Sequence, residues 1–304
     1  MTHVVVSPCR NESVFMMKTL KSVAAQSQKP DLWIIVDDGS TDDTPQLLAE
    51  FARENPWVTI VAKPDRGHRA VGPGVIEAFY FGLDTIDLDD FDYVTKLDLD
   101  LDLPEKYFEI LIGRMEENPR IGTCSGKPYF RGKDGELHSE MRGDEMSVGM
   151  TKVYQTKCFK DIGGFVREVM WDGIDCHACR KKGWIACSWD EPDLVFEHLR
   201  PMGSSQKGII TGKMRHGFGQ YFMGSDPLYF TSTAIFRMRE KPYVIGGLAI
   251  MWGYFKSMLS GKPQLEDKEL RDFIGRYQRR VLALRSKTRA TAEFDKAGEA
   301  IWSH

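Results

Sequence analysis

Three aspartates at alternate positions are the most informative residues of this sequence. They lie in the segment Lys96-Leu97-Asp98-Leu99-Asp100-Leu101-Asp102-Leu103. In an extended chain, residues two apart point to the same side, so the aspartates would line one face while the leucines face a core. Carboxylates this close repel one another unless a cation lies among them, and Mg²⁺ and Mn²⁺ prefer oxygen ligands and bridge to phosphates. The segment predicts a divalent-cation site, and the alternative is a solvated acidic edge strand.

A second acidic cluster, Asp37-Asp38-Gly39-Ser40-Thr41-Asp42, directly follows the apolar run at 32–36. An aspartate at the end of a central strand can accept hydrogen bonds from the N–H of a base or from ribose hydroxyls. The alternative is a turn that contributes helix-capping residues.

The first hundred residues alternate strand-like and helix-like segments. Strands are expected at 3–7, 32–36, 58–61 and 93–97. Helices are expected at 11–26, from Thr44 (as N-cap, with Pro45 at the first helical position), near 75–83 and from Pro104. This alternation predicts βαβ units and a mostly parallel sheet with helices on both faces. Because ligands of such sheets bind beyond the carboxyl ends of the strands, both acidic clusters should face one crevice.

The second half is less regular. Strands are expected at 122–130, 147–155 and 184–189, and helices at 174–182 and 265–287. Residues 201–226 are rich in Gly, Ser, Lys and Arg and predict a flexible loop whose basic residues could close over a diphosphate. Residues 242–255 form an uncharged segment.

Composition limits the class of protein. The chain has 304 residues, of which 42% are hydrophobic and 28% charged, which argues against disorder. The net charge of −3 gives no sign of nucleic-acid binding by bulk attraction. The first residues include neither a basic leader nor a long apolar run, so we expect a cytoplasmic protein.

Four segments, in their order and spacing, resemble the family 2 glycosyltransferases: Ser7-Pro8-Cys9-Arg10-Asn11-Glu12, Ser22 to Pro30, Val36 to Thr44 and Lys96 to Asp100. The resemblance runs from residue 3 to about residue 200. It implies the GT-A fold and transfer of a sugar from a nucleotide diphosphate to an acceptor hydroxyl with inversion. We therefore expect a catalytic domain at 1–235, with a nucleotide-binding half at 1–105 and an acceptor-binding half at 106–235, and a helical appendage at 236–304.

The resemblance assigns roles residue by residue. Asp38 would contact the base, Asp98 the ribose, and Asp100 the metal that holds the diphosphate. The resemblance also places Pro8, Arg10, Glu12, Asp37, Arg66 and Arg69 near the nucleotide sugar. Lys96 is a further candidate there, and Arg200 could close over the diphosphate together with the basic residues that follow it. Asp102 has no fixed place in the family pattern.

The catalytic base should follow Gly163-Gly164-Phe165, where relatives carry an acidic pair on a loop leading into a helix. This chain departs from the usual adjacent Glu-Asp pair and has Trp171-Asp172-Gly173-Ile174-Asp175 instead. Asp172 is the favoured base and Asp175 the second candidate, because Asp175 would lie one turn into the helix. A plain helix N-cap is the alternative for Asp172.

His198 follows an expected strand and resembles the metal-binding histidine of many GT-A enzymes. With Asp100 and two phosphate oxygens it would complete a Mn²⁺ or Mg²⁺ site, and the alternative is a histidine hydrogen-bonded to a neighbour.

The family most often uses a UDP-sugar, and a hexose or N-acetylhexosamine is expected. The acceptor would be a glycan or lipid-linked glycan of surface polysaccharide synthesis. Two alternatives stay open. A nucleotidyltransferase would carry a Gly-rich loop after the first strand, whereas 7–12 has no glycine. A non-catalytic binding module would be expected to lack one of the acidic clusters.

The uncharged segment 242–255 is too short for a spanning helix, which needs about 20 residues. Its flanks are basic, with Arg237, Arg239, Lys241, Lys256 and Lys262. These features predict a peripheral contact with the inner face of the cytoplasmic membrane. The alternative is packing against the catalytic domain or a second subunit. The sequence does not reveal the oligomeric state.

Overall fold

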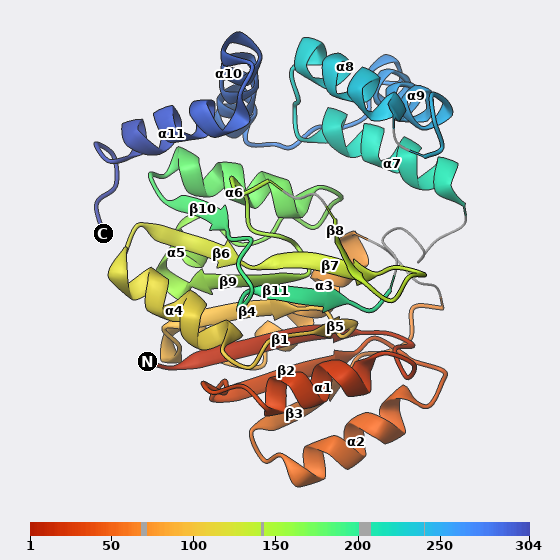
Figure 1. Cartoon of the computed structure of the whole chain (residues 1–304), viewed down its shortest axis with the longest axis vertical. Coiled ribbons are helices and arrows are strands. Elements are labelled where there is room, and N and C mark those ends of the chain that lie inside the picture. Colours follow the sequence, from red (N-terminus) through yellow and green to blue (C-terminus); the bar gives the residue numbers. More distant parts are fainter. Residues whose placement is uncertain (68–71, 141–142, 201–207, 240) are drawn as a thin grey trace. The chain divides into compact units, whose positions relative to one another are not determined.

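The computed structural model describes residues 1–67, 72–140, 143–200, 208–239 and 241–304 (Figure 1). The chain divides into two compact units. The first consists of Met1–Arg167 and Trp184–Pro201, and the second of Glu168–Gly183 and Met202–His304. The domain boundary expected after residue 235 stays a prediction.

A seven-stranded sheet organises the first unit. Its strands, in spatial order, are β10 (Ile185–Ser188), β6 (Ile121–Ser125), β9 (Thr151–Gln155), β4 (Tyr93–Leu97), β1 (His3–Cys9), β2 (Leu32–Asp37) and β3 (Val58–Ala62). Strand β9 pairs antiparallel with both neighbours, and the other pairs are parallel. The mostly parallel sheet predicted from the alternation of elements is confirmed.

Helices cover both faces of this sheet, as the alternating side chains of its strands require. Val5, Trp33 and Ile35 belong to a core shared with α1 (Met16–Ala24), α2 (Thr44–Glu54) and α4 (Tyr107–Glu117). The intervening residues face α3 (Pro73–Leu83), because a Cβ at Gly82 of that helix would lie 2.5 Å from Val36 Cγ2. The short α5 (Thr156–Asp161) packs Phe159 on Phe79 of α3, and η1 (Leu88–Asp90) precedes β4.

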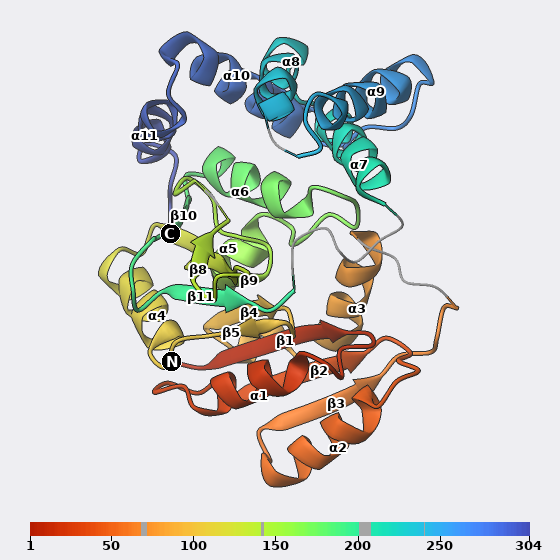
Figure 2. The same cartoon turned by 45° about the vertical axis from the view of Figure 1, so that its right-hand side comes forward.

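A second, four-stranded sheet in this unit has the order β5 (Leu101–Asp102), β11 (Val195–His198), β7 (Lys127–Arg131) and β8 (Leu137–Ser139). Strands β5, β11 and β8 are labelled in Figure 2, and β7 in Figure 1. The single strand expected at 122–130 is wrong, because the chain passes from the large sheet to the small one at Gly126. A Cβ there would lie 1.8 Å from the Leu194 carbonyl oxygen. Only glycine permits this close passage.

The described part of the second unit is helical. It contains α6 (Trp171–Lys181), α7 (Ile209–Phe222), α8 (Pro227–Phe236), η2 (Arg237–Arg239), α9 (Ile245–Leu259), α10 (Lys268–Leu284) and α11 (Lys287–Gly298). The flexible loop expected at 201–226 is therefore wrong from residue 209 onward, and residues 201–207 lie outside the described chain. No helix in the described ranges combines the length and the apolar character needed to cross a membrane.

Two helices begin at residues other than those predicted, and neither shift changes where the strands of the sheet end. Asp43 is the N-cap residue of α2 in place of Thr44, and Pro45 lies in the first helical turn. Helix α4 begins at Tyr107, a few residues after Pro104.

Candidate functional site

Three neighbouring strands bring the predicted nucleotide-binding residues to one edge of the large sheet. Strand β1 lies between β4 and β2, with Cys9 opposite Asp37 and Val6 opposite Lys96. The three strands are parallel, so the residues that follow them leave the sheet at the same edge. Pro8, in β1, lies opposite Val36 beside this edge. The two acidic clusters predicted to face one crevice therefore follow strands that end at the same edge of the sheet.

The Asp38 carboxylate is held by two cations. Lys63 Nζ lies 3.0 Å from Asp38 Oδ1, and Arg66 Nη2 lies 2.5 Å from Oδ2. The Arg10 guanidinium donates to the backbone oxygen of Asp38 and pairs with Asp65 at 2.7 Å. A carboxylate has about four lone-pair sites, so it can still accept a hydrogen bond from a ligand. Asp38 is thus held in place by two cations before any ligand arrives.

Asp37 has a mainly local role. Its Oδ1 accepts a 2.9 Å hydrogen bond from the backbone N–H of Ser40, which closes the turn after β2. Gly39 within this turn has φ +70, and a Cβ there would lie 2.5 Å from Asp65 Cα. The turn that was the alternative prediction for this segment is therefore present, and Asp38 lies within it next to Asp37.

Asp98 follows β4 and is paired with a buried lysine. Lys96 is 2% exposed, and its Nζ lies 2.5 Å from Asp98 Oδ1 and 2.9 Å from the Gly149 carbonyl oxygen. Burial raises the pKa of Asp98, and the charge of Asp100 adds to this although Lys96 opposes it. The buried Lys96 therefore holds the Asp98 carboxylate in place.

The pairing of β5 with β11 places His198 and Arg200 beside Asp100. Leu199 N–H donates to the Asp100 carbonyl at 2.8 Å, and His198 lies opposite Leu101. His198 Nε2 is 3.8 Å from Asp100 Oδ2. The other ring nitrogen, Nδ1, is 2.6 Å from Glu140 Oε1. Burial lowers the pKa of His198, but hydrogen bonds and charge from Asp100 and Glu140 raise it to about 9.

Glu140 was not predicted from the sequence. It directly follows β8, its side chain is 4% exposed, and its Oε2 is buried with no hydrogen-bond partner among the described residues. No local pattern marks it, because its proximity to His198 depends on the order of strands in the small sheet.

Arg200 connects the acids of this region. Its Nε lies 3.4 Å from Asp100 Oδ2, and its Nη2 pairs with Glu12. The guanidinium also lies over the Phe15 ring, 5.1 Å from the centroid. Burial raises the pKa of Asp100, but the hydrogen bond and charge of His198 and the charges of Arg200 and Lys96 outweigh it, so the pKa is lowered.

The residues around Asp100 suit a hard divalent cation. An imidazole that donates from one nitrogen to a carboxylate and turns the other toward a metal is a recurrent arrangement in metal sites, because the carboxylate fixes the ring. Glu140, His198 and Asp100 follow this order. In the described ranges no group of three or more His, Cys, Asp and Glu side chains is arranged to hold a metal ion. A cation here would have Asp100 and His198 as protein ligands and would need oxygens from a bound diphosphate.

The alternation predicted along 97–103 is partly confirmed. Leu97, Leu99, Leu101 and Leu103 are buried, whereas Asp98, Asp100 and Asp102 are partly exposed. Asp102, however, lies in β5 and pairs with Lys18 at 3.1 Å. It thus has a partner on α1 and does not join Asp100.

The two candidate bases belong to the second unit. Asp172 is the second residue of α6 and is partly exposed, whereas Asp175 lies one turn further and is 2% exposed. The N-cap residue is Met170, in a left-handed conformation, so Asp172 is not a plain N-cap. Arg69 lies outside the described residues.

Comparison with known proteins extends this picture. The sequence model described as Glycosyl transferase family 2 matches residues 4–171. A poly-beta-1,6-N-acetyl-D-glucosamine synthase of Staphylococcus aureus (strain COL) is 28% identical over 130 residues, which are 42% of this chain and 29% of the synthase. The match therefore spans less than a third of that relative's length.

Solved structures share the fold. TarS 1–349 of S. aureus, in complex with UDP-GlcNAc, has a TM-score of 0.53 at 14% identity and covers 99% of this chain and 91% of its own. The mannosyltransferase PcManGT from Pyrobaculum calidifontis, in complex with GDP-Man and Mn²⁺, has a TM-score of 0.52 at 16% identity, covering 98% and 86%. These likenesses establish a GT-A architecture, and the matching family model, which spans more than half of the chain, establishes the family. The chain is a member of glycosyl transferase family 2.

Proposed function

We propose that this glycosyltransferase transfers an N-acetylhexosamine from a UDP-sugar to a hydroxyl of a growing glycan, with inversion at the anomeric carbon. The observation that carries the donor assignment is the pair of clusters at one sheet edge, with the fixed Asp38 carboxylate on one side and Asp100 with His198 on the other. The relative is named a synthase of poly-beta-1,6-N-acetyl-D-glucosamine, and TarS was crystallised with UDP-GlcNAc. These relatives support the choice of sugar and base.

Each side chain would have one task in donor binding. Asp38 would accept a hydrogen bond from the base, and Asp98 from a ribose hydroxyl. Pro8, Arg10, Glu12, Asp37, Arg66 and Lys96 would shape and hold the nucleotide pocket. Arg200 would contact the diphosphate once that ligand replaces part of its pairing with Glu12 and Asp100. Arg69 would also contact the nucleotide sugar.

Asp100 and His198 would hold a divalent cation, Mn²⁺ or Mg²⁺. When bound, the cation supplies charge neutralisation to the leaving nucleoside diphosphate. PcManGT was crystallised with Mn²⁺, which supports this assignment.

The transfer would be a direct displacement. The acceptor oxygen forms a bond to the anomeric carbon while the bond from that carbon to the diphosphate oxygen breaks, and its electron pair leaves with the nucleoside diphosphate. The hydroxyl proton passes to Asp172, the proposed base. Asp172 is preferred to Asp175 because it is the more exposed carboxylate of α6.

A nucleotide-sugar panel tests the donor. The protein would be incubated with UDP-GlcNAc, UDP-GalNAc, UDP-glucose and GDP-mannose, with Mn²⁺ and N-acetylglucosamine oligomers, and both nucleotide release and product linkage would be measured. We expect the fastest release with a UDP-N-acetylhexosamine and a β-linked product by NMR. An α-linked product would exclude inversion, and preference for GDP-mannose would exclude the proposed donor.

The base assignment predicts a loss of catalysis without a loss of donor binding. Asp172→Asn should lower kcat by about 10²- to 10⁴-fold, because the acceptor proton then has no carboxylate to receive it. UDP affinity, measured by calorimetry with Mn²⁺ present, should stay unchanged. Asp175→Asn is the matched control, and an inactive Asp175→Asn beside an active Asp172→Asn would reverse the assignment.

A further inference from the structure

Helix α9 and the two residues before it carry an exposed apolar strip. Ile245, Leu248, Trp252 and Leu259 recur at intervals of three, four and seven residues, which places them on one side of the helix. Leu248 is 52% and Trp252 60% exposed, and Tyr243 and Val244 just before the helix are equally open. We call these six residues the α9 strip. Large apolar side chains gathered in this way mark an interaction surface.

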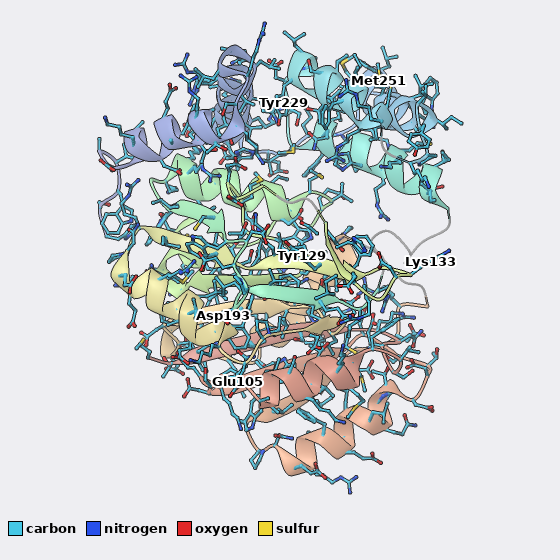
Figure 3. The ribbon with its side chains drawn as sticks, viewed as in Figure 1. Glu105, Tyr129, Lys133, Asp193, Tyr229 and Met251 are labelled. Atoms are coloured by element: carbon cyan, nitrogen blue, oxygen red, sulfur yellow. The ribbon has the colours of Figure 1, made fainter. Side chains whose placement is uncertain are left out.

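The opposite side of α9 is fixed by close packing within its own unit. A Cβ at Gly217 of α7 would lie 2.0 Å from the Ile250 carbonyl oxygen, and a Cβ at Gly253 would lie 2.0 Å from that of Met214. Tyr254 stacks on Phe230 of α8 with ring centroids 4.1 Å apart. Figure 3 labels Tyr229 of α8 and Met251 of α9 within this helical unit. This contact leaves α9 no freedom to turn the strip inward.

The surroundings of the strip are basic although the whole chain is acidic. Between residues 227 and 263 the sequence contains five basic residues and one acidic residue, Glu240, against a net charge of −3 for the full chain. The basic residues are Arg237, Arg239, Lys241, Lys256 and Lys262. Lys256 lies four residues after Trp252, on the same side of the helix, and Lys241 lies two residues before Tyr243; both are exposed. The strip is therefore bordered by positive charge at both ends.

We propose that the α9 strip docks on the surface of a bilayer that contains anionic lipid, with the helix axis parallel to the membrane plane. A helix of 15 residues is about 22 Å long and suits an interfacial position. Trp252 and Tyr243 are side chains that favour the headgroup level, and the lysines would meet anionic headgroups. A second copy of the chain fits less well, because a two-fold contact through the strip would bring equal positive charges together. Docking of this kind requires neither donor nor acceptor.

Vesicle flotation tests the proposal with the full chain. Phosphatidylcholine vesicles would be compared with vesicles that contain phosphatidylglycerol in addition, at low and high salt. We expect recovery with the anionic vesicles, reduced by salt and by the absence of phosphatidylglycerol. Each of Lys241→Gln and Lys256→Gln should lower the partition coefficient about fivefold.

A paired substitution tests the strip itself. Leu248→Glu with Trp252→Glu should lower partitioning by more than tenfold, whereas Ile301→Glu, at an apolar residue that is 57% exposed in the same unit, should not. If the double variant does not fold, brominated-lipid quenching of tryptophan fluorescence in the native protein, lost in Trp252→Phe, gives the same answer. Full recovery in the soluble fraction with both vesicle types would overturn the proposal. So would a dimer in light scattering that the double variant dissociates, since a second copy would then cover the strip.

Discussion

Two neighbouring clusters at the same sheet edge differ in the balance between acidic and basic side chains. The Asp38 cluster (Arg10, Asp38, Lys63, Asp65 and Arg66) has three cationic and two anionic side chains. The Asp100 cluster (Glu12, Lys96, Asp98, Asp100, Glu140, His198 and Arg200) has four carboxylates against two permanently charged bases. The first cluster needs no added charge, whereas the second carries two surplus negative charges, of which a proton on His198 offsets one and a divalent cation would offset both.

This difference in charge suits the two clusters to different tasks. The Asp38 cluster would recognise the base, and the Asp100 cluster would hold the cation that neutralises the diphosphate. A carboxylate already paired with lysine and arginine can accept a specific hydrogen bond from a ligand, but a metal ion would stabilise it little further. A group of acids with a histidine oriented by Glu140 favours a divalent cation, and the cation in turn favours a diphosphate. Substitutions in the two clusters should therefore change different kinetic parameters.

The largest effect is expected at Asp100. Asp100→Asn removes the proposed charged ligand and should cost at least about 3 kcal/mol of transition-state stabilisation, a hundredfold or more in kcat/KM. Asp102→Asn is the control, because Asp102 pairs with Lys18 outside the cluster. Equal rates for the two variants, or full activity of the native protein in excess EDTA, would contradict the assignment of a catalytic cation to the Asp100 cluster.

A smaller effect is expected from the histidine and its orienting carboxylate. His198→Ala should raise the Mn²⁺ concentration for half activity, and Glu140→Gln should raise it about tenfold or more, because loss of the orienting acid typically weakens metal affinity by 10- to 100-fold. Direct Mn²⁺ binding in the presence of UDP, followed by electron paramagnetic resonance, should weaken in parallel. Unchanged metal titrations in both variants would return His198 to a structural role.

The Asp38 cluster predicts a pure binding effect. Asp38→Asn should raise the KM for the donor about tenfold, since a hydrogen bond to a charged acceptor contributes about 1.5–3 kcal/mol. The Mn²⁺ concentration for half activity should not move. A shifted metal requirement in this variant would mean that the two clusters act as one.

The last effect lies at the other end of β1 and concerns stability instead of activity. Burial lowers the pKa of His3 to about 4, although the charge of Asp31 opposes this, and its Nε2 is 2.8 Å from Thr95 Oγ1. Because the unfolded chain takes up this proton near pH 6.5, the stability due to neutral His3 is complete above pH 6.5 and is lost as the pH falls toward 4. At pH 4.5 the loss should be about 2 kcal/mol. Chemical denaturation of the native protein and of His3→Gln from pH 7 to 4.5 should show the smaller acid sensitivity in the variant, and equal sensitivity would contradict the burial of a neutral ring.

The sequence predicted the parts of the site that depend on local order. The strands that end at Asp37 and Leu97 could be predicted because an apolar run stops there and acidic residues follow. Parallel pairing then brings the ends of these strands to the same edge of the sheet. The alternation of leucine with aspartate also survived, since it reflects burial on one side only.

The features that the sequence did not predict depend on contacts between distant segments. Glu140 reaches His198 through the small sheet, whose strand order no local pattern encodes. Helix α7 was taken for a loop because of its glycines, yet Gly217 allows α9 to approach it closely. Gly126 likewise divides one apparent strand into two that belong to different sheets.

Anomalous scattering from Mn²⁺ in crystals grown with UDP is the most direct test of the Asp100 cluster as the cation site. We predict a single strong peak about 2–2.5 Å from an Asp100 carboxylate oxygen and from His198 Nε2, with the diphosphate on its open side and the base at Asp38. A peak elsewhere, or well-ordered UDP with no manganese beside Asp100, would contradict this assignment.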